Sequence, residues 1–151
     1  MAPKGKKANA TEKQKDREEE REDPLQAVIL CDSYETRFNP FTLERPRCLL
    51  PLANTPLIEY TLEFLANAGV EEVFVYCGAH TEQVEEYMQL SKWTSRSSPF
   101  AKLELIRSTS RSIGDAMRDL DKRAILAGDF LVVYGDVISN LPLEAALAVH
   151  R

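Results

Sequence analysis

Four short apolar runs alternate with segments of helical periodicity, and this alternation limits most strongly how the chain can fold. Strand-length runs followed by amphipathic segments form β-α units, whose strands pair in parallel through right-handed crossovers. The predicted strands are 25–30, 70–77, 102–107 and 129–134, and the predicted helices are 56–68, 81–90, 115–124 and 142–150. The sequence therefore predicts an α/β fold with a mainly parallel sheet and helices on both faces.

The first predicted helix has clear signals at both of its ends. Thr55 is a suitable N-cap, Pro56 suits the first helical position, and Gly69 is a natural stop. In the third predicted helix we expect Leu120 and Ala124 to face the core. Residues 91–99 are rich in serine and read as a loop.

The last predicted strand, 129–134, is apolar nearly throughout. Such a run is typical of a parallel strand that is covered on both faces, so we expect a central position in the sheet. The helical pattern that follows reaches Arg151 without a stop signal. We therefore interpret 24–151 as the N-terminal part of one domain, incomplete at its C-terminal end.

Residues 1–23 differ sharply in composition from the rest of the chain. They contain seven basic and seven acidic side chains and no large apolar residue beyond Met1. Such a segment cannot bury enough surface to offset the entropy lost on ordering, so we expect a disordered, charged tail. Its KGKK run fits a solubilising role better than a targeting or RNA-binding role.

Charge and hydropathy exclude several classes of function. The net charge is −5, which argues against a nucleic-acid-binding surface. No apolar run approaches the roughly 18 residues that a membrane span requires, and the N-terminus does not resemble a secretion signal. The three cysteines form no CxxC pair, which favours buried structural thiols over a metal or redox site. These features together predict a cytosolic protein without direct contact to nucleic acid or membrane.

The segment after the first strand, 31–51, is the usual place for a phosphate in an open α/β sheet. It carries Arg37, Arg45 and Arg47. However, the chain has no glycine between Gly5 and Gly69, and backbone can approach a phosphate closely only where no Cβ intervenes. The segment is placed like a phosphate cradle but lacks the residues that form one.

Asp136 is the strongest single candidate for chemistry. It follows an apolar strand and Gly135, which places its carboxylate at the ligand-binding edge of such a sheet. There it could hold Mg²⁺ against a substrate phosphate. The alternative is an aspartate that caps a turn, and spacing alone favours that alternative.

Three further positions are open to two interpretations. Arg37 and Arg47 could pair with phosphate oxygens or be surface arginines, and spacing does not separate the two. Gly114-Asp115 could form a turn that faces a ligand, but Ser112 to Asp115 reads more simply as a helix start.

The chain from Leu25 onward resembles the sugar-phosphate nucleotidyltransferases. The matching motifs are Thr36-Arg37-Phe38, Pro40-Phe41-Thr42, Pro46-Arg47, Leu50-Pro51, Ala68-Gly69, Gly114-Asp115-Ala116 and Gly135-Asp136. The resemblance implies a Rossmann-like nucleotidyltransferase fold, with Asp136 at the position of the family's metal-binding aspartate.

The departures from the family pattern imply that the activity is lost. Cys31, Asp32, Ser33 and Glu35 stand where the family has loop glycines. The two acids lie where a triphosphate would bind, and a like charge within a few ångströms costs of order 1 kcal/mol or more near a surface. Arg47 replaces a lysine of the family, keeping the charge but not its compact geometry. We therefore expect no catalytic residue, no bound metal and no cofactor.

Within the family, the chain resembles one non-catalytic branch throughout. That branch supplies a subunit of a guanine-nucleotide exchange complex in translation initiation. The resemblance implies a scaffold that assembles with the other subunits, chiefly a gamma subunit, and helps to dock the initiation factor. The domain that performs the exchange is expected outside this chain.

Two other functions stay open. One is an active sugar-1-phosphate nucleotidyltransferase similar to GDP-mannose pyrophosphorylase. In it Arg37 would hold phosphate, Arg47 would neutralise developing charge, and Asp136 would bind Mg²⁺. The other is a regulatory site that binds a nucleotide without turning it over.

Overall fold

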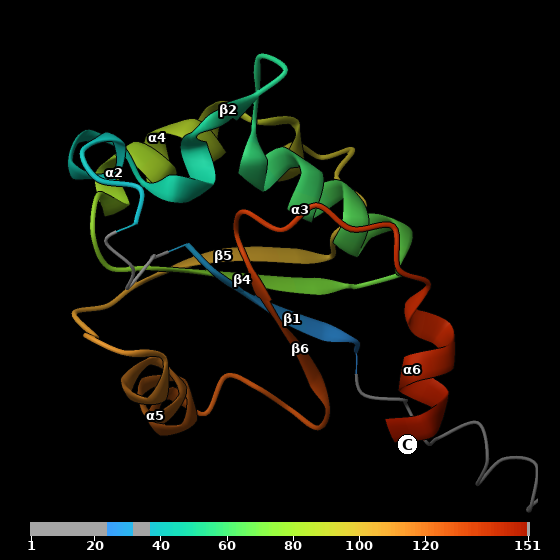
Figure 1. Cartoon of the computed structure of the whole chain (residues 1–151). Helices are drawn as coiled ribbons and strands as arrows, with labels where there is room; N and C mark the ends of the chain where they lie inside the picture. The colour runs from blue at the N-terminus through green and yellow to red at the C-terminus, as the bar shows by residue number, and fades with distance from the viewer. Residues whose placement is uncertain (1–23, 32–36, 151) are drawn as a thin grey trace, which may run out of the picture.

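A four-stranded parallel sheet forms the centre of the computed structural model, which describes residues 24–31 and 37–150 (Figure 1). The strands are β1 (Gln26–Leu30), β4 (Glu72–Cys77), β5 (Lys102–Arg107) and β6 (Phe130–Tyr134). They lie in the order β5-β4-β1-β6, and every pair in this sheet is parallel. The predicted parallel sheet is thus confirmed.

Helices cover both faces of the sheet, as predicted. They are α3 (Leu57–Asn67), α4 (Thr81–Leu90), α5 (Ile113–Arg123) and α6 (Leu143–His150). Figure 1 shows α3 and α4 on one side of the sheet and α5 on the other. Each side has its own core. Leu62 and Val84 belong to the first cluster, and Ala116 and Leu120 belong to the second.

The segment between β1 and α3 contains short elements that the sequence did not predict. They are α2 (Phe41–Glu44), the 3₁₀ helix η1 (Arg47–Leu49), β2 (Pro51–Leu52) and β3 (Thr55–Pro56). The expectation that Thr55 caps the first helix is wrong. Thr55 pairs with Leu52 in the β2-β3 hairpin, so α3 begins only at Leu57. The predicted stop is confirmed, because Gly69 follows the helix with a φ of +76°.

β6 lies at an edge of the described sheet, which corrects the expectation of a central, doubly covered strand. Phe130, Val132 and Tyr134 are 38%, 45% and 46% exposed. In register these residues flank Gln26, Val28 and Leu30 of β1, on the face that α5 covers. The buried cluster beneath α5 consists of residues from β1, β4, β5 and α5. Among the described residues, this face of β6 contributes nothing to the cluster and stays exposed.

Ala124 is also placed differently from the prediction. It does not face the core but is exposed and follows α5 as its C-cap, with a φ of +50°. The helix therefore ends one residue earlier than its periodicity indicates, and Leu120 supplies its last buried contact.

A buried tryptophan anchors the segment between α4 and β5. Residues Lys92–Thr94 form the 3₁₀ helix η2 within the predicted loop. The Trp93 indole is 3% exposed, and its Nε1 donates to Glu59 Oε2 over 2.8 Å. The hydroxyl of Tyr87 donates to the other oxygen of Glu59 over 2.7 Å. One carboxylate of α3 thus joins α4 and η2.

This contact gives a pH-dependent contribution to stability. Burial and the hydrogen bond to Glu59 raise the pKa of Tyr87 above its ordinary value. Above about pH 10 the unfolded chain loses the Tyr87 proton while the folded chain keeps it. We expect the free energy of unfolding to fall as the pH rises from about 9 to 11, and to fall less steeply in Tyr87→Phe. Denaturant unfolding across this range measures the difference, and identical slopes in the two proteins would contradict it.

None of the helices formed by residues 24–31 and 37–150 is long and apolar enough to cross a membrane.

Candidate functional site

An ion pair lies at the carboxyl end of the sheet, where the sequence places its main candidates. The guanidinium Nε of Arg47 is 2.5 Å from Oδ2 of Asp136. The side chains are 26% and 15% exposed, so the pair is largely shielded from water. Arg47 also stacks on Phe38, with Cζ 4.3 Å from the ring centroid. The structure therefore brings two of the predicted site residues into direct contact.

Local backbone geometry places both partners. The amide of Gly135 donates to Leu30 O over 2.9 Å, which extends the pairing of β1 and β6 by one residue and puts Asp136 just beyond the edge of the sheet. Arg47 begins η1, whose turn is closed by a 3.1 Å hydrogen bond from Leu50 N to Arg47 O. The hydroxyl of Thr61 donates to Val137 O over 2.9 Å, which fixes the chain after Asp136 to α3.

The ion pair fits poorly with the metal site of the related enzymes. Mg²⁺ is usually held in proteins by one or two carboxylates together with waters and phosphates, whereas Oδ2 of Asp136 already accepts from a cation. The structure described for 24–31 and 37–150 also has no group of three or more His, Cys, Asp or Glu that could hold a metal ion. Oδ2 of Asp136 could bind a metal only after Arg47 has moved away from it.

The other candidates in the segment after β1 are only partly described. Arg37 is exposed, and so is Arg45. Asp32 and Glu35 lie outside the described residues.

Gly114 and Asp115 form the first turn of α5, which agrees with the simpler interpretation of this motif. Ser112 caps the helix, and its Oγ accepts from Asp115 N over 3.2 Å. The carboxylate of Asp115 forms an ion pair with Arg118 Nη1 at 2.8 Å. These contacts are those of a capped helix N-terminus.

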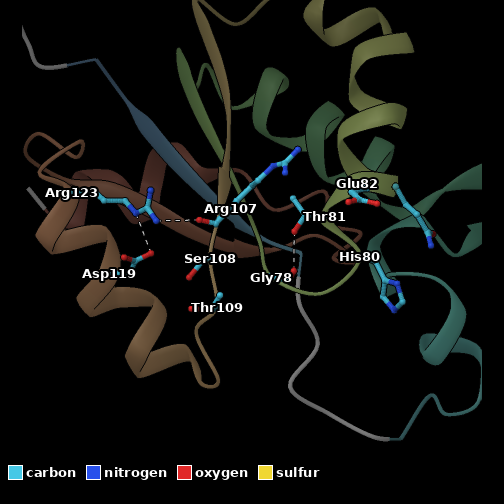
Figure 2. Close-up of a pocket in the computed structure, with 10 residues that line it drawn as sticks. Gly78, His80, Thr81, Glu82, Arg107, Ser108, Thr109, Asp119 and Arg123 are labelled. Atoms are coloured by element: carbon cyan, nitrogen blue, oxygen red, sulfur yellow. Dashed lines mark hydrogen bonds and ion pairs between the residues drawn. The ribbon is translucent and has the colours of Figure 1, made fainter.

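A pocket of about 560 Å³ lies beside this edge, and the sequence did not predict it (Figure 2). It is formed by the turn before α4, the end of β5 and the face of α5. Figure 2 shows Arg123 directed toward the backbone of Arg107 and the carboxylate of Asp119. Arg107 ends a parallel strand, and Asp119 and Arg123 are spaced i,i+4. These two signals could have indicated the pocket.

The two arginines at this pocket are paired with carboxylates. Arg123 Nε lies 3.1 Å from Asp119 Oδ2, and Arg107 pairs with Glu85. Burial raises the pKa of Asp119, but hydrogen bonds from Tyr76 and Arg123 outweigh burial and hold that pKa below its ordinary value. Asp119 is thus an anion whose charge is balanced within the fold.

All three cysteines are buried, as expected for structural thiols. Hydrogen bonds with Cys48 and Cys77, together with burial, raise the pKa of the Cys31 thiol well above its ordinary value. A thiol that resists ionisation is a poor nucleophile and a poor metal ligand.

The sequence model of one family, described as nucleotidyl transferase, matches residues 26–151. The chain belongs to this family. Its four-stranded parallel sheet and covering helices form the α/β fold of this family, and Gly135-Asp136 stands at the carboxyl edge of that sheet.

Two relatives within this family are subunits of a translation factor. The chain is 57% identical over 127 residues to translation initiation factor eIF2B subunit epsilon of Schizosaccharomyces pombe, which covers 84% of the chain and 19% of that relative. It is 46% identical over 130 residues to the protein of the same name from Dictyostelium discoideum, covering 86% of the chain and 18% of the relative. The chain thus spans about a fifth of the length of these curated relatives.

The fold is also that of a solved nucleotidyl transferase. A UDP-glucose pyrophosphorylase, complexed with UDP-glucose, superposes with a TM-score of 0.65 at 23% identity. The match covers 85% of this chain and 53% of that chain. At this identity the likeness concerns the fold alone.

Proposed function

We propose that the chain is the non-catalytic nucleotidyl transferase segment of an eIF2B epsilon subunit. In this role it is a scaffold within the guanine-nucleotide exchange complex for initiation factor 2. The identity of 57% to the fission-yeast subunit supports the membership. The observation that carries the non-catalytic role is the ion pair between Arg47 and Asp136.

Nucleotidyl transfer depends on cations that stabilise the charge developing on phosphate. In this chain the guanidinium of Arg47 and the carboxylate of Asp136, which stands where the family has its metal-binding aspartate, neutralise each other at 2.5 Å. Opening the pair would expose two charges that are now shielded, and only binding of both a metal and an anion could compensate. The segment 31–51, which has no glycine and carries Asp32 and Glu35, makes such compensation weaker.

The same proposal specifies partners and location. The partners are the other eIF2B subunits, especially gamma, and initiation factor 2 itself. Nucleic acid and membrane are not expected partners, and neither a metal nor a cofactor is required. A complex of this kind works in the cytosol.

The competing function is an active sugar-1-phosphate nucleotidyltransferase. One observation favours it: Arg47 and Asp136 meet at the edge of the sheet where the family performs its chemistry. In this case Arg47 would turn from Asp136 to the phosphate, and Asp136 would hold Mg²⁺.

Calorimetric titration separates the two functions. We expect GTP with Mg²⁺ to show no binding tighter than about 10 μM, which corresponds to roughly 7 kcal/mol. We also expect no release of pyrophosphate when mannose 1-phosphate is added. An active mannose-1-phosphate guanyltransferase is the positive control. Tight Mg²⁺-dependent binding with pyrophosphate release would establish the competing function, and tight binding without release would indicate a regulatory nucleotide site.

A further inference from the structure

We infer that Gly135 and Cys48 position the ion pair between Arg47 and Asp136. Each of the two is the chain neighbour of one ion-pair residue. A Cβ added to Gly135 would lie 2.9 Å from the Cβ of Cys48, a separation that real Cβ atoms essentially never show. The end of β6 and the helix η1 therefore touch at a point where only a hydrogen atom fits.

Rotation of a side chain cannot relieve this contact, because a Cβ has a fixed position relative to its own backbone. Cys48 is 1% exposed, and its Cβ is attached directly to the main chain of η1. The amide of Gly135 is held by Leu30 O at 2.9 Å. Two other atoms also lie close to the added Cβ. They are Ile29 Cγ2 at 3.3 Å and Cys31 Sγ at 3.4 Å, both side-chain ends that can shift by a few tenths of an ångström.

A side chain at position 135 therefore displaces η1, and Arg47 moves with it. Gly135 does not have a positive φ, so an alanine there adds a steric conflict without backbone strain. This inference extends the proposed function. It rests on that function in one respect: the paired form of Arg47 and Asp136 is taken as the ordinary state of the site. Gly135 and Cys48 then act through their neighbours and contact no ligand themselves.

The coupling between positions 47 and 136 provides the test. We compare Arg47→Gln, Asp136→Asn and the double variant, first in the natural chain and then with Gly135→Ala. In the natural chain we expect the double variant to lower Tm by clearly less than the two single variants together, because both remove the same interaction. With Gly135→Ala we expect the two shifts to add, because the pair is already separated.

Two substitutions at Cys48 identify the atom responsible. Cys48→Gly removes the Cβ and should restore the coupling in the Gly135→Ala background. Cys48→Ala keeps the Cβ and should not restore it. Gly114→Ala is the matched control, because a Cβ there meets only atoms at 3.8 and 3.9 Å, and the coupling should be unchanged.

Coupling between positions 47 and 136 that persists in Gly135→Ala would overturn the inference. A glycine with a structural role alone would lower Tm on substitution but would leave that coupling unchanged. If Gly135→Ala does not fold, rescue of folding by Cys48→Gly but not by Cys48→Ala supports the inference. Rescue by both or by neither overturns it. The result is independent of nucleotide binding: tight binding of GTP would refute the proposed function and leave the measured coupling as it is.

Discussion

We expect Leu62→Ala to lower the free energy of unfolding by about 3 kcal/mol. Leu62 is fully buried in α3, within the core cluster between the helices and the sheet. Alanine is an excellent helix former, so the loss comes from the missing side-chain contacts and the cavity rather than from the helix itself. Chemical denaturation followed by circular dichroism measures the change.

Leu90→Ala is the matched control for this substitution. Leu90 is likewise a helical leucine, the last residue of α4, but its side chain is 84% exposed. The same chemical change should therefore alter the free energy of unfolding by less than about 0.5 kcal/mol. Equal effects at the two positions would show that α3 does not pack on the sheet as described.

The second large effect is expected from Glu59→Leu, at about 2 kcal/mol. Leucine has a comparable size but accepts no hydrogen bond, so Trp93 Nε1 and the Tyr87 hydroxyl both lose their partner. The indole is nearly inaccessible to water and cannot replace the acceptor with solvent. Trp93 is the single tryptophan of the chain, so its fluorescence reports directly on this contact.

A double-mutant comparison isolates the contribution of each donor. In the Tyr87→Phe background one of the two orphaned donors no longer exists, so Glu59→Leu should cost less than in the natural chain. An unchanged cost would mean that the Tyr87 hydroxyl contributes nothing to the stability of the folded chain. A change in the wavelength of tryptophan emission is expected for Glu59→Leu in both backgrounds, because the indole loses the hydrogen bond to Glu59.

Periodicity was sufficient to predict the sheet and its covering helices. Strand 102–107 and helix 81–90 agree with β5 and α4 residue by residue. Here the local signal and the tertiary packing coincide: one face of α4 is apolar, and that face is buried. The α/β order of the elements then leaves few topologies, because parallel strands require right-handed crossovers.

The errors have a common physical origin in contacts between distant segments. β6 is as apolar as a central strand, yet among the described residues it pairs with β1 alone, and no local pattern records that pairing. Thr55 has the chemistry of an N-cap, but the hairpin with Leu52 competes for the same residue. In each case a tertiary or cross-strand interaction outweighs the local preference.

The sequence indicated which residues belong to the candidate site, but not that two of them would form an ion pair with each other. Arg47 and Asp136 could be named from the position of their segments relative to the strands. That they pair with each other could not, since their approach depends on the fit of Cys48 against Gly135. The pocket near Arg107 was missed because its residues come from three elements that only the fold brings together.

The strand order β5-β4-β1-β6 has a consequence for the order of events during synthesis. β1 is made first, yet it lies between β4 and β6, so it gains its second neighbour only after residue 134 has left the ribosome. Until then one edge of β1 in the nascent chain has no neighbouring strand, although every residue of β1 is buried in the folded protein. During this interval the apolar strand with its unpaired edge is prone to aggregation, and pairing with β6 removes that edge.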